Sequence, residues 1–497
     1  MGIIGRQTIK SSIYSYAGVI VGFVTVGILM PHYLTKTEIG VTRQIQYYGL
    51  LFSSILGFGI PQSLIRLFPH FKNSKNGNYG FFALVTLITA LSAILFSVIF
   101  MLYGLEFVQK DILKSPLFAS FYQLILPFTL AYMFLTLFES YSTANKESTI
   151  AVFLRDFVLR VLILVSIALF IWLPGYNFSQ LVHTNVYLQF VPVILIIIFL
   201  FSKKLIHFAS KISFPSKNTK REFISTSAFN WVNGLSSVAV VTIDSIMLSK
   251  MTDSADVGIY TTVTFFAGLM LIPNRNIGRI ASSVIADHFK NNNLTQIESI
   301  YKKSALTQYA LGLFLLGNLI LAVPFIFQIL LKNEFNSGIW VLIFLAFTNL
   351  FKMGTGLKFS IIFTSKYYKW STVMFIAFLL LIVLTNLWFI PRYGIVGSAL
   401  ASLIATSIFH LAGLILVKLK FSYWPFTKSF LTSGVACVLI FTILFFIPSF
   451  NFPVPVSIVK SLVFSTLFLL FLYRTKSVPE INDLADSVIE KIKDKIR

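Results

Sequence analysis

Long apolar stretches separated by short polar turns run through nearly all of the 497-residue chain. A stretch of about 20 apolar residues is long enough for an α-helix to cross a bilayer, whose hydrocarbon core is about 30 Å thick. The pattern predicts fourteen such spans, at 10–31, 43–67, 80–103, 117–138, 150–172, 179–201, 222–249, 257–286, 304–331, 337–363, 370–390, 394–417, 424–447 and 453–473. The predicted fold class is therefore an all-α polytopic membrane protein with about 14 transmembrane helices.

The two ends of the chain are expected to differ in character. The apolar run from Ile13 to Met30 is longer than the apolar region of a signal peptide and lacks a convincing cleavage site, so it predicts a retained first span. Residues 474–497 predict a surface helix, with acidic residues early, basic residues late and one apolar stripe along its length. This tail either anchors the chain at the membrane interface or docks a partner.

Lysine and arginine are distributed unevenly between the predicted loops. With an inside N-terminus, the inside segments hold 25 of the 40 basic residues and the outside loops hold seven. Because cytoplasmic loops carry the excess of positive charge, both termini are predicted to be cytoplasmic. The link 202–221 carries six basic residues and is expected to lie along the anionic inner leaflet.

Composition excludes several classes of protein. The chain is 56% hydrophobic and 12% charged, whereas a soluble domain carries about 25% charge. The net charge of +22 is spread over short loops, which argues against a nucleic-acid partner. One cysteine allows no intramolecular disulfide, and the six histidines show no metal-ligand spacing. No nucleotide-binding or nucleophile motif is present, and no outside loop exceeds about a dozen residues, so no catalytic residue, metal or cofactor is predicted.

The chain also contains an internal repeat. Glu38-Ile-Gly40 leads through an apolar run to His70-Phe-Lys-Asn73, and Asp256-Val-Gly258 leads in the same way to His288-Phe-Lys-Asn291, 218 positions later. Two weaker matches, displaced by 220 and 217 positions, follow between later spans. Six spans per copy is an even number, so both copies have the same orientation, as in parallel transporter repeats.

The repeat divides the predicted chain into five parts. These are an N-terminal six-helix lobe (1–201), a basic cytoplasmic linker (202–221), a C-terminal six-helix lobe (222–417), two additional transmembrane helices (424–473) and the amphipathic tail (474–497). Two similar bundles packed face to face are expected to enclose a cleft for a substrate.

Several short segments carry a family resemblance. They are Thr8-Ile-Lys-Ser-Ser12, Leu29-Met-Pro31, Glu38-Ile-Gly40, Asp244-Ser-Ile-Met-Leu248, Val257-Gly-Ile-Tyr260 and Ile390-Pro-Arg-Tyr-Gly-Ile-Val-Gly-Ser-Ala-Leu400. With these segments the chain resembles the polysaccharide-biosynthesis flippases, which handle O-antigen and other lipid-linked oligosaccharides, of the multidrug/oligosaccharidyl-lipid/polysaccharide exporter superfamily. The resemblance covers essentially the whole chain, and its degenerate motifs identify the superfamily better than the substrate.

The resemblance implies a fold and a function. It implies a V-shaped, two-lobed bundle in the bacterial cytoplasmic membrane, with the first two spans of each half lining the cleft. It also implies transfer of an undecaprenyl-diphosphate-linked oligosaccharide from the inner to the outer leaflet by alternating access. The expected partners are this lipid-linked substrate, membrane lipids, a coupling proton or cation, and other polysaccharide-assembly proteins.

Charged residues inside the predicted spans are the first candidates for a substrate site, because a cation at mid-bilayer costs about 2.5–3.5 kcal/mol on insertion scales. Arg275 and Arg279 are four residues apart, and so on one helical face, roughly 27 and 33 Å into their span at 1.5 Å per residue. Either they bind the lipid diphosphate, as arginine does bidentately, or Arg279 extends to the cytoplasmic interface. The repeat equivalents of Asp244, Arg275 and Arg279 are uncharged, which marks this copy as the site.

The other candidates each have two interpretations. Asp244 pairs with a cleft arginine or binds a coupling proton or cation, or is a plain interfacial acid. Asn230 and Asn233 bind sugar hydroxyls or join helices. Arg43 is a release-side contact or an interface anchor. Arg160 binds substrate or, as we prefer, forms a neutralised pair with Asp156 one turn earlier.

Two lysines of the tenth predicted span are treated separately. Lys352 and Lys358 are six residues apart, about 240° around a continuous helix, so they are not expected to share a face. Lys352 is the candidate for the cavity, and Lys358 is expected to extend to the membrane interface.

Two other functions remain open. A multidrug or small-molecule antiporter of the same fold is the first alternative, although such pumps usually place acids in the cleft and this chain has more cations than acids at depth. A membrane glycosyltransferase or polymerase is the second, and it needs catalytic groups that the sequence does not display.

Overall fold

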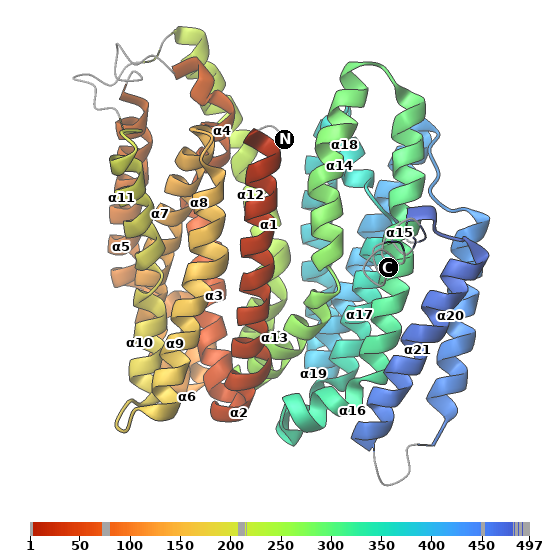
Figure 1. Ribbon diagram of the computed structural model, residues 1–497. Coiled ribbons are helices and arrows are strands. Elements are labelled where there is room, and N and C mark those ends of the chain that lie inside the picture. The colour runs from red at the N-terminus through yellow and green to blue at the C-terminus, as the bar shows by residue number, and fades with distance from the viewer. Residues whose placement is uncertain are drawn as a thin grey trace. The chain divides into compact units, whose positions relative to one another are not determined.

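The computed structural model describes residues 3–71, 80–206, 214, 216–448, 453–480, 482, 486 and 490. All regular secondary structure in these ranges is helical, which confirms the predicted all-α class. The chain divides into two compact units, Met1–Thr261 and Thr262–Arg497 (Figure 1). Of the predicted tail helix, 474–497, the structure describes residues 474–480, 482, 486 and 490, and the rest lies outside the described residues.

The first unit is a bundle of helices that extends into α13. Its α-helices are α1 (Ile3–Gly22), α2 (Met30–Tyr33), α3 (Lys36–Leu56), α4 (Ile60–Phe71), α5 (Phe81–Lys114), α6 (Pro116–Ala119), α7 (Ile125–Ala144), α8 (Ser148–Val152), α9 (Leu159–Trp172), α10 (Phe178–Tyr187), α11 (Phe190–Ser202), α12 (Lys217–Met251) and α13 (Ser254–Leu269). Two π-helical turns, η1 (Phe23–Leu29) and η4 (Phe153–Val158), and one 3-10 turn, η3 (Tyr122–Leu124), connect them.

The second unit contains the remaining helices. They are α14 (Ile272–Lys290), α15 (Leu294–Leu321), α16 (Val323–Phe325), α17 (Ile339–Gly354), α18 (Lys358–Thr364), α19 (Tyr368–Phe421), α20 (Lys428–Phe446) and α21 (Pro453–Thr475), with a π-helical turn η5 (Ile326–Leu330) and a 3-10 turn η6 (Asn333–Gly338). The predicted additional spans, α20 and α21, pack on α15 around Phe464 and Phe468.

All fourteen predicted spans fall on helices, but their number is not confirmed. Within the described residues, ten helices are long and apolar enough to cross a membrane, and the bent pair α3 and α4 raises the number to eleven. Two of the fourteen predicted spans share α19, which is bent at Gly394, a residue with φ +54°. Others are divided by turns, as α13 and α14 are at Met270 and Leu271. A count of long apolar helices therefore treats two predicted spans within one helix as one, and it omits predicted spans that a turn divides into shorter helices.

The ends of α3 and α13 show why the repeated segments are alike. Thr35 and Glu38 form a capping box at the start of α3, with the Thr35 amide donating to Glu38 at 2.8 Å. The glycines of the two repeat motifs then meet. A Cβ on Gly40 would lie 1.7 Å from the Ser254 carbonyl oxygen, and one on Gly258 would lie 1.8 Å from the Lys36 carbonyl oxygen. Only glycine permits this approach of α3 and α13.

The compact units do not follow the repeat. The second copy of the repeat begins near Arg221, yet α12 packs against α3 and α4 in the first unit. Trp231 donates to the Ile55 carbonyl oxygen at 2.7 Å, and Gly59, with φ +66°, lies directly against the α12 backbone. The six-helix lobes and the cleft between them therefore remain predictions from the sequence.

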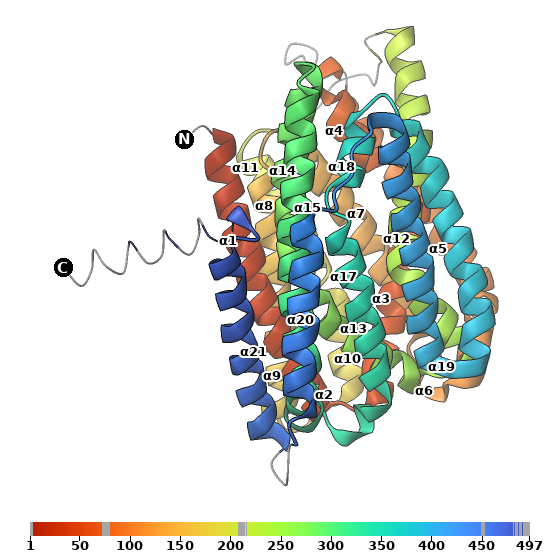
Figure 2. The same ribbon diagram turned by 90° about the vertical axis from the view of Figure 1, so that its right-hand side faces the viewer.

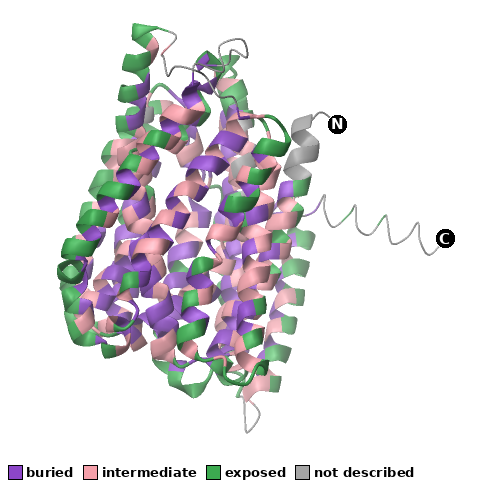
Figure 3. Cartoon of the chain, turned by 90° about the vertical axis from the view of Figure 1, so that its left-hand side faces the viewer, coloured by how far each residue is buried: buried purple, intermediate pink, exposed green. Residues whose placement is uncertain are grey.

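The outer surface is apolar, as lipid contact requires. On α5 the side chains of Leu91, Met101 and Leu102 are 58%, 76% and 70% exposed, whereas Phe96 and Phe100 on the same helix are buried. Exposed residues follow the outer sides of the helices and buried ones lie between them (Figure 3). The chain is a multi-pass membrane protein.

Candidate functional site

A cavity of about 260 Å³ lies within the second unit, between α14, the region joining α17 to α18, and α19. Helices α14 and α18 lie side by side there (Figure 2). Its lining residues are Leu271, Asn274, Arg275, Gly278, Lys352, Gly356, Leu357, Lys358, Phe359, Ser360 and His410. The structure thus brings together two of the predicted site residues, Arg275 and Lys352, with two side chains that were not predicted to lie there.

A break in the tenth predicted span brings the two lysines together. Helix α17 ends at Gly354 and α18 begins at Lys358, and between them Gly356 has φ +59°. A Cβ on Gly356 would lie 2.7 Å from the Cβ of Ala305, so the turn also needs glycine for space. The expectation that Lys352 and Lys358 do not share a face assumed about 240° of separation on an unbroken helix, and the break lets both residues line the same cavity.

Lys358 is fully buried, so the prediction that it extends to the membrane interface is wrong. Its Nζ lies 2.5 Å from Thr355 Oγ1, to which it donates, and 2.7 Å from His410 Nδ1. The aliphatic stem fits because a Cβ on Gly413 would already lie 3.1 Å from it. Lys358 Nζ also lies 4.8 Å from the centre of the Phe359 ring. These inward contacts give the ammonium group polar partners without reaching water.

The cavity is strongly cationic. Its lining holds Arg275, Lys352, Lys358 and His410 and, among the described residues, no aspartate or glutamate. Arg275 is exposed in the cavity, and the ion pairs between described residues include neither Arg275 nor Lys358. Arg279 lies one turn further along α14, and its side chain is outside the described residues. A group of cations with no carboxylate beside it is suited to bind an anion.

Other predicted site residues lie in the first unit, away from this cavity. Asp244 is buried on α12 and accepts a hydrogen bond from the Tyr260 hydroxyl at 3.1 Å. Asn230 donates to Ser63 Oγ on α4 at 3.0 Å, which joins two helices. Asn233 donates to its own helix, at the carbonyl oxygen of Phe229, and Arg43 donates to Gln46 Oε1 at 2.9 Å. These residues belong to the first unit, whereas Arg275 belongs to the second.

Arg160 makes a helix contact rather than lining the cavity. Its guanidinium donates to the Gly18 carbonyl oxygen on α1 at 2.8 Å, and Gly22 gives it space there. Asp156, its preferred predicted partner, instead forms an ion pair with Arg155 at 3.0 Å and accepts a hydrogen bond from Ser15 at 2.8 Å.

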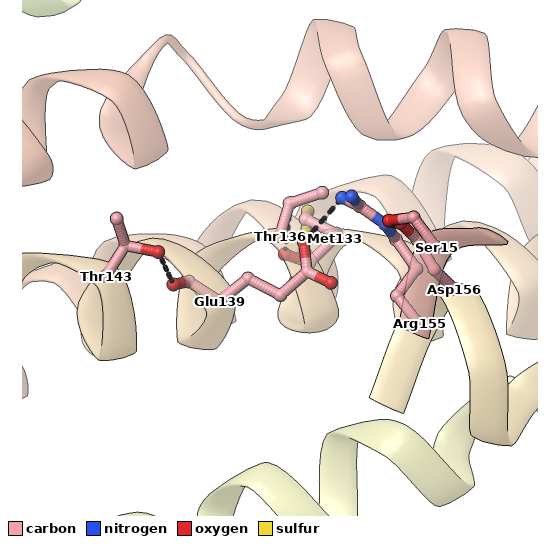
Figure 4. A network of polar contacts seen from close by, with 7 residues as sticks. All are labelled: Ser15, Met133, Thr136, Glu139, Thr143, Arg155 and Asp156. Atoms are coloured by element: carbon pink, nitrogen blue, oxygen red, sulfur yellow. Dashed lines mark hydrogen bonds and ion pairs between the residues drawn. The ribbon is translucent and has the colours of Figure 1, made fainter. Parts of the chain in front are cut away.

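Arg155 connects two acids in the interior of the first unit (Figure 4). It pairs with Glu139 on α7 at 3.0 Å as well as with Asp156 on η4. Glu139 is 8% exposed, and its Oε1 has no hydrogen-bond partner among the described residues. This network joins α7, η4 and α1, and the π-helical turn presents both charged residues of the Arg155–Asp156 pair.

The sequence contains a signal for one of the two residues that were missed. Gly354 and Gly356 flank the turn before Lys358, and such a pair inside an apolar run favours a helix break. His410 is a lone histidine in a glycine- and alanine-containing span, and only the tertiary structure shows that it lies 2.7 Å from Lys358.

Comparison with known proteins identifies the family. The sequence matches the family described as polysaccharide biosynthesis protein over residues 4–286, more than half of the chain. The chain belongs to this family. The resemblance inferred from its short motifs is therefore confirmed. No curated protein matches the sequence.

Solved transporter structures share the fold of this polysaccharide biosynthesis protein. The lipid II flippase MurJ in an inward closed conformation is 14% identical with a TM-score of 0.75, covering 94% of this chain and 99% of its own. An inward-facing multidrug resistance MATE family transporter is 14% identical with a TM-score of 0.61, covering 83% and 94%. A superfamily transporter from Pyrococcus furiosus is 15% identical with a TM-score of 0.54, covering 84% and 95%. The fold is that of solved transporters and flippases.

Proposed function

We propose that this protein exports a lipid-diphosphate-linked oligosaccharide from the inner to the outer leaflet of the bacterial cytoplasmic membrane by alternating access. The observation that carries the proposal is the cavity lined by Arg275, Lys352 and Lys358 with no described carboxylate. In this family the anionic group that such a site suits is the diphosphate that joins the glycan to its lipid. Undecaprenyl diphosphate is the proposed carrier, and an O-antigen or lipopolysaccharide unit is one proposed glycan.

The size of the cavity assigns it to the head of the substrate rather than to the whole molecule. Ligand pockets for drug-sized molecules span about 300–1,000 Å³, and this cavity measures about 260 Å³. Arg275 provides bidentate contacts to phosphate oxygens, while the lysines act as point charges. The lipid tail remains in the bilayer, and the sugars extend beyond the cavity.

Membrane potential supplies a driving force in this proposal. With an inside-negative potential, moving one charge across 100 mV is worth about 2.3 kcal/mol, so a doubly charged head gains roughly 4–5 kcal/mol on outward transfer. A coupled proton or cation adds to this force. Both termini are proposed to be cytoplasmic, which places the Arg275 end of α14 in the cytoplasmic half.

The remaining candidate residues have supporting roles in the proposal. Arg279 extends the anion site along α14. Asp244 is a proton or cation site, because it is a buried acid that shares a hydrogen bond with Tyr260. Arg43 and Asn233 are proposed substrate contacts, whereas the hydrogen bonds of Asn230 and Arg160 favour helix packing.

A multidrug antiporter is the second candidate function. A cationic drug entering the second-unit cavity would meet three cations, which argues against this function. The Pyrococcus furiosus relative is described as having a binding pocket of reversed polarity that suggests a different function, so pocket charge is a relevant criterion within the superfamily. A glycosyltransferase or polymerase function has no supporting group in the cavity.

Reconstituted transport tests the proposal. Proteoliposomes carrying a labelled undecaprenyl-diphosphate oligosaccharide and an inside-negative potential are expected to expose the label in the outer leaflet. Arg275→Ala is expected to lower the rate by roughly 10–100-fold, since a hydrogen bond to a charged group contributes about 1.5–3 kcal/mol. Arg275→Lys is expected to lose less. Arg66→Ala is the matched control, because Arg66 is exposed and makes only a 4.0 Å ion pair with Glu222.

Two results would overturn the proposal. One is the absence of transport with any lipid-diphosphate sugar under the imposed potential. The other is equal transport by wild-type protein and Arg275→Ala, which would remove the cavity from the substrate path. Drug resistance on overexpression would favour the antiporter instead.

A further inference from the structure

Two buried basic side chains share one hydrogen bond at the wall of the cationic cavity. Lys358 Nζ lies 2.7 Å from His410 Nδ1, and both side chains are buried. Two nitrogens at this distance form a hydrogen bond only if one of them lacks a proton. Either the Lys358 nitrogen donates to an imidazole nitrogen that lacks a proton, or the imidazole N–H donates to a neutral amine. In each case the pair carries at most one positive charge, although its two members could carry two.

The surroundings keep this pair one proton short while the cavity holds no anion. Arg275 from α14 and Lys352 from α17 line the same cavity and add positive charge. From α15, the Tyr301 hydroxyl donates to the Thr355 carbonyl oxygen at 3.4 Å. No described carboxylate lines the cavity. A second proton on the pair would therefore meet the positive charge of Arg275 and Lys352, with the neutral Thr355 hydroxyl as its nearby polar partner and no described carboxylate.

A bound anion reverses this balance. A diphosphate in the cavity places two negative charges beside the pair, and opposite charge at short range favours the protonated form of a base. Phosphate oxygens also accept hydrogen bonds, so Lys358 Nζ and a protonated His410 can both donate to the anion. The extra proton comes from water and belongs to the pair rather than to either residue.

We propose that the Lys358–His410 pair is a proton acceptor that couples anion binding in the second-unit cavity to the uptake of one proton. The proposal rests on the proposed function for the presence of a diphosphate in this cavity. Linkage then requires the affinity for the anion to fall as the pH rises, by up to about tenfold per pH unit where one proton is taken up.

Calorimetry on the purified full-length protein in detergent tests the coupling. The probe is P1,P2-dimethyl diphosphate, a doubly charged diester that does not titrate near neutral pH. Binding is measured at mildly alkaline pH in two buffers with different heats of ionisation, and the difference gives the number of protons taken up. Wild-type protein is expected to take up about one proton per diester bound.

Matched variants assign the proton. His410→Gln keeps an acceptor for Lys358 but does not titrate, so it is expected to bind the diester with uptake close to zero. His183→Gln is the control, because His183 is an exposed histidine of the first unit that bonds only its own helix at Ser179. It is expected to leave the uptake unchanged. Arg275→Ala is expected to weaken binding while keeping the number of protons per bound diester.

The outcomes separate this inference from the proposed function. Failure of wild-type protein to bind the diester overturns the anion site and with it the coupling. Binding without proton uptake overturns the coupling alone and leaves the anion site in place. Unchanged uptake in His410→Gln overturns the assignment to this pair. The wild-type count decides the coupling by itself if a variant does not fold.

Discussion

The contact between Gly40 and Gly258 predicts a large difference between two glycine-to-alanine substitutions on one helix. Gly258 and Gly268 both lie in α13, and neither has a positive φ. A Cβ on Gly258 would lie 1.8 Å from the Lys36 carbonyl oxygen and 3.0 Å from the Gly40 nitrogen, whereas one on Gly268 would meet nothing within 4 Å. The pair therefore separates the effect of packing from the effect of helix propensity.

The expected magnitude follows from these distances. Restoring an ordinary contact of 3.4 Å requires α3 and α13 to move apart by about 1.6 Å. Overpacking costs about 1–3 kcal/mol, and the upper end applies because the obstacle is backbone rather than a flexible side chain. Alanine gains up to about 1 kcal/mol over glycine in a helix. Gly258→Ala is expected to lose about 2 kcal/mol of unfolding free energy, and Gly268→Ala to gain up to about 1 kcal/mol.

Denaturant unfolding of the purified protein in detergent measures both values. The same comparison with Gly40→Ala is expected to reproduce the loss, because a Cβ on Gly40 would lie 1.7 Å from the Ser254 carbonyl oxygen. Equal unfolding midpoints for Gly258→Ala and Gly268→Ala would refute the close approach of α3 and α13.

Three further predictions concern charged groups. Arg155→Ala is expected to lower the unfolding free energy by about 1–3 kcal/mol. This loss is smaller than for a fully buried ion pair because the Arg155 side chain is 44% exposed. A loss in Arg155→Ala no greater than the loss in Arg155→Lys would contradict the ion pair with Glu139. Burial and the nearby Asp253 raise the pKa of the Asp256 carboxyl. The contribution of Asp256 to the unfolding free energy is therefore present at acid pH and is lost as the pH rises through the raised pKa. Asp256→Asn is expected to remove this pH-dependent loss when the unfolding free energy is measured as a function of pH. Lys358→Met is expected to fold with unchanged or higher unfolding free energy while binding of the diphosphate diester weakens more than tenfold, and unchanged binding would remove Lys358 from the site.

The all-helical, membrane-spanning character of the chain was predictable because it depends on local composition. A run of about 20 apolar residues determines a span wherever the rest of the chain lies. The helices from α1 to α21 accordingly cover every predicted span, and the family resemblance was confirmed. The number of spans was less secure, since a bend such as that at Gly394 or a turn such as that before Lys358 is a conformational detail within an apolar run.

The candidate site was only partly predictable. A cation inside an apolar run is visible in the sequence, and Arg275 and Lys352, both singled out in this way, line the second-unit cavity. The partners of a side chain depend on which helices meet, and the sequence contains no record of that. The hydrogen bond from Asn230 to Ser63 and the ion pair of Asp156 with Arg155 were therefore visible only in the structure.

The sequence by itself determined an apolar, repeated, positively charged chain that spans the membrane many times, because hydropathy and charge act locally. The tertiary structure decided where the charges meet. Lys358 and His410 are 52 residues apart and form one hydrogen bond because α17 breaks before Lys358 and α19 packs against α18. Helix periodicity placed Lys358 on the wrong face, and the conformation of Gly356 brought it to the cavity beside Lys352. Packing between distant segments, rather than local pattern, formed the cavity proposed as the anion site.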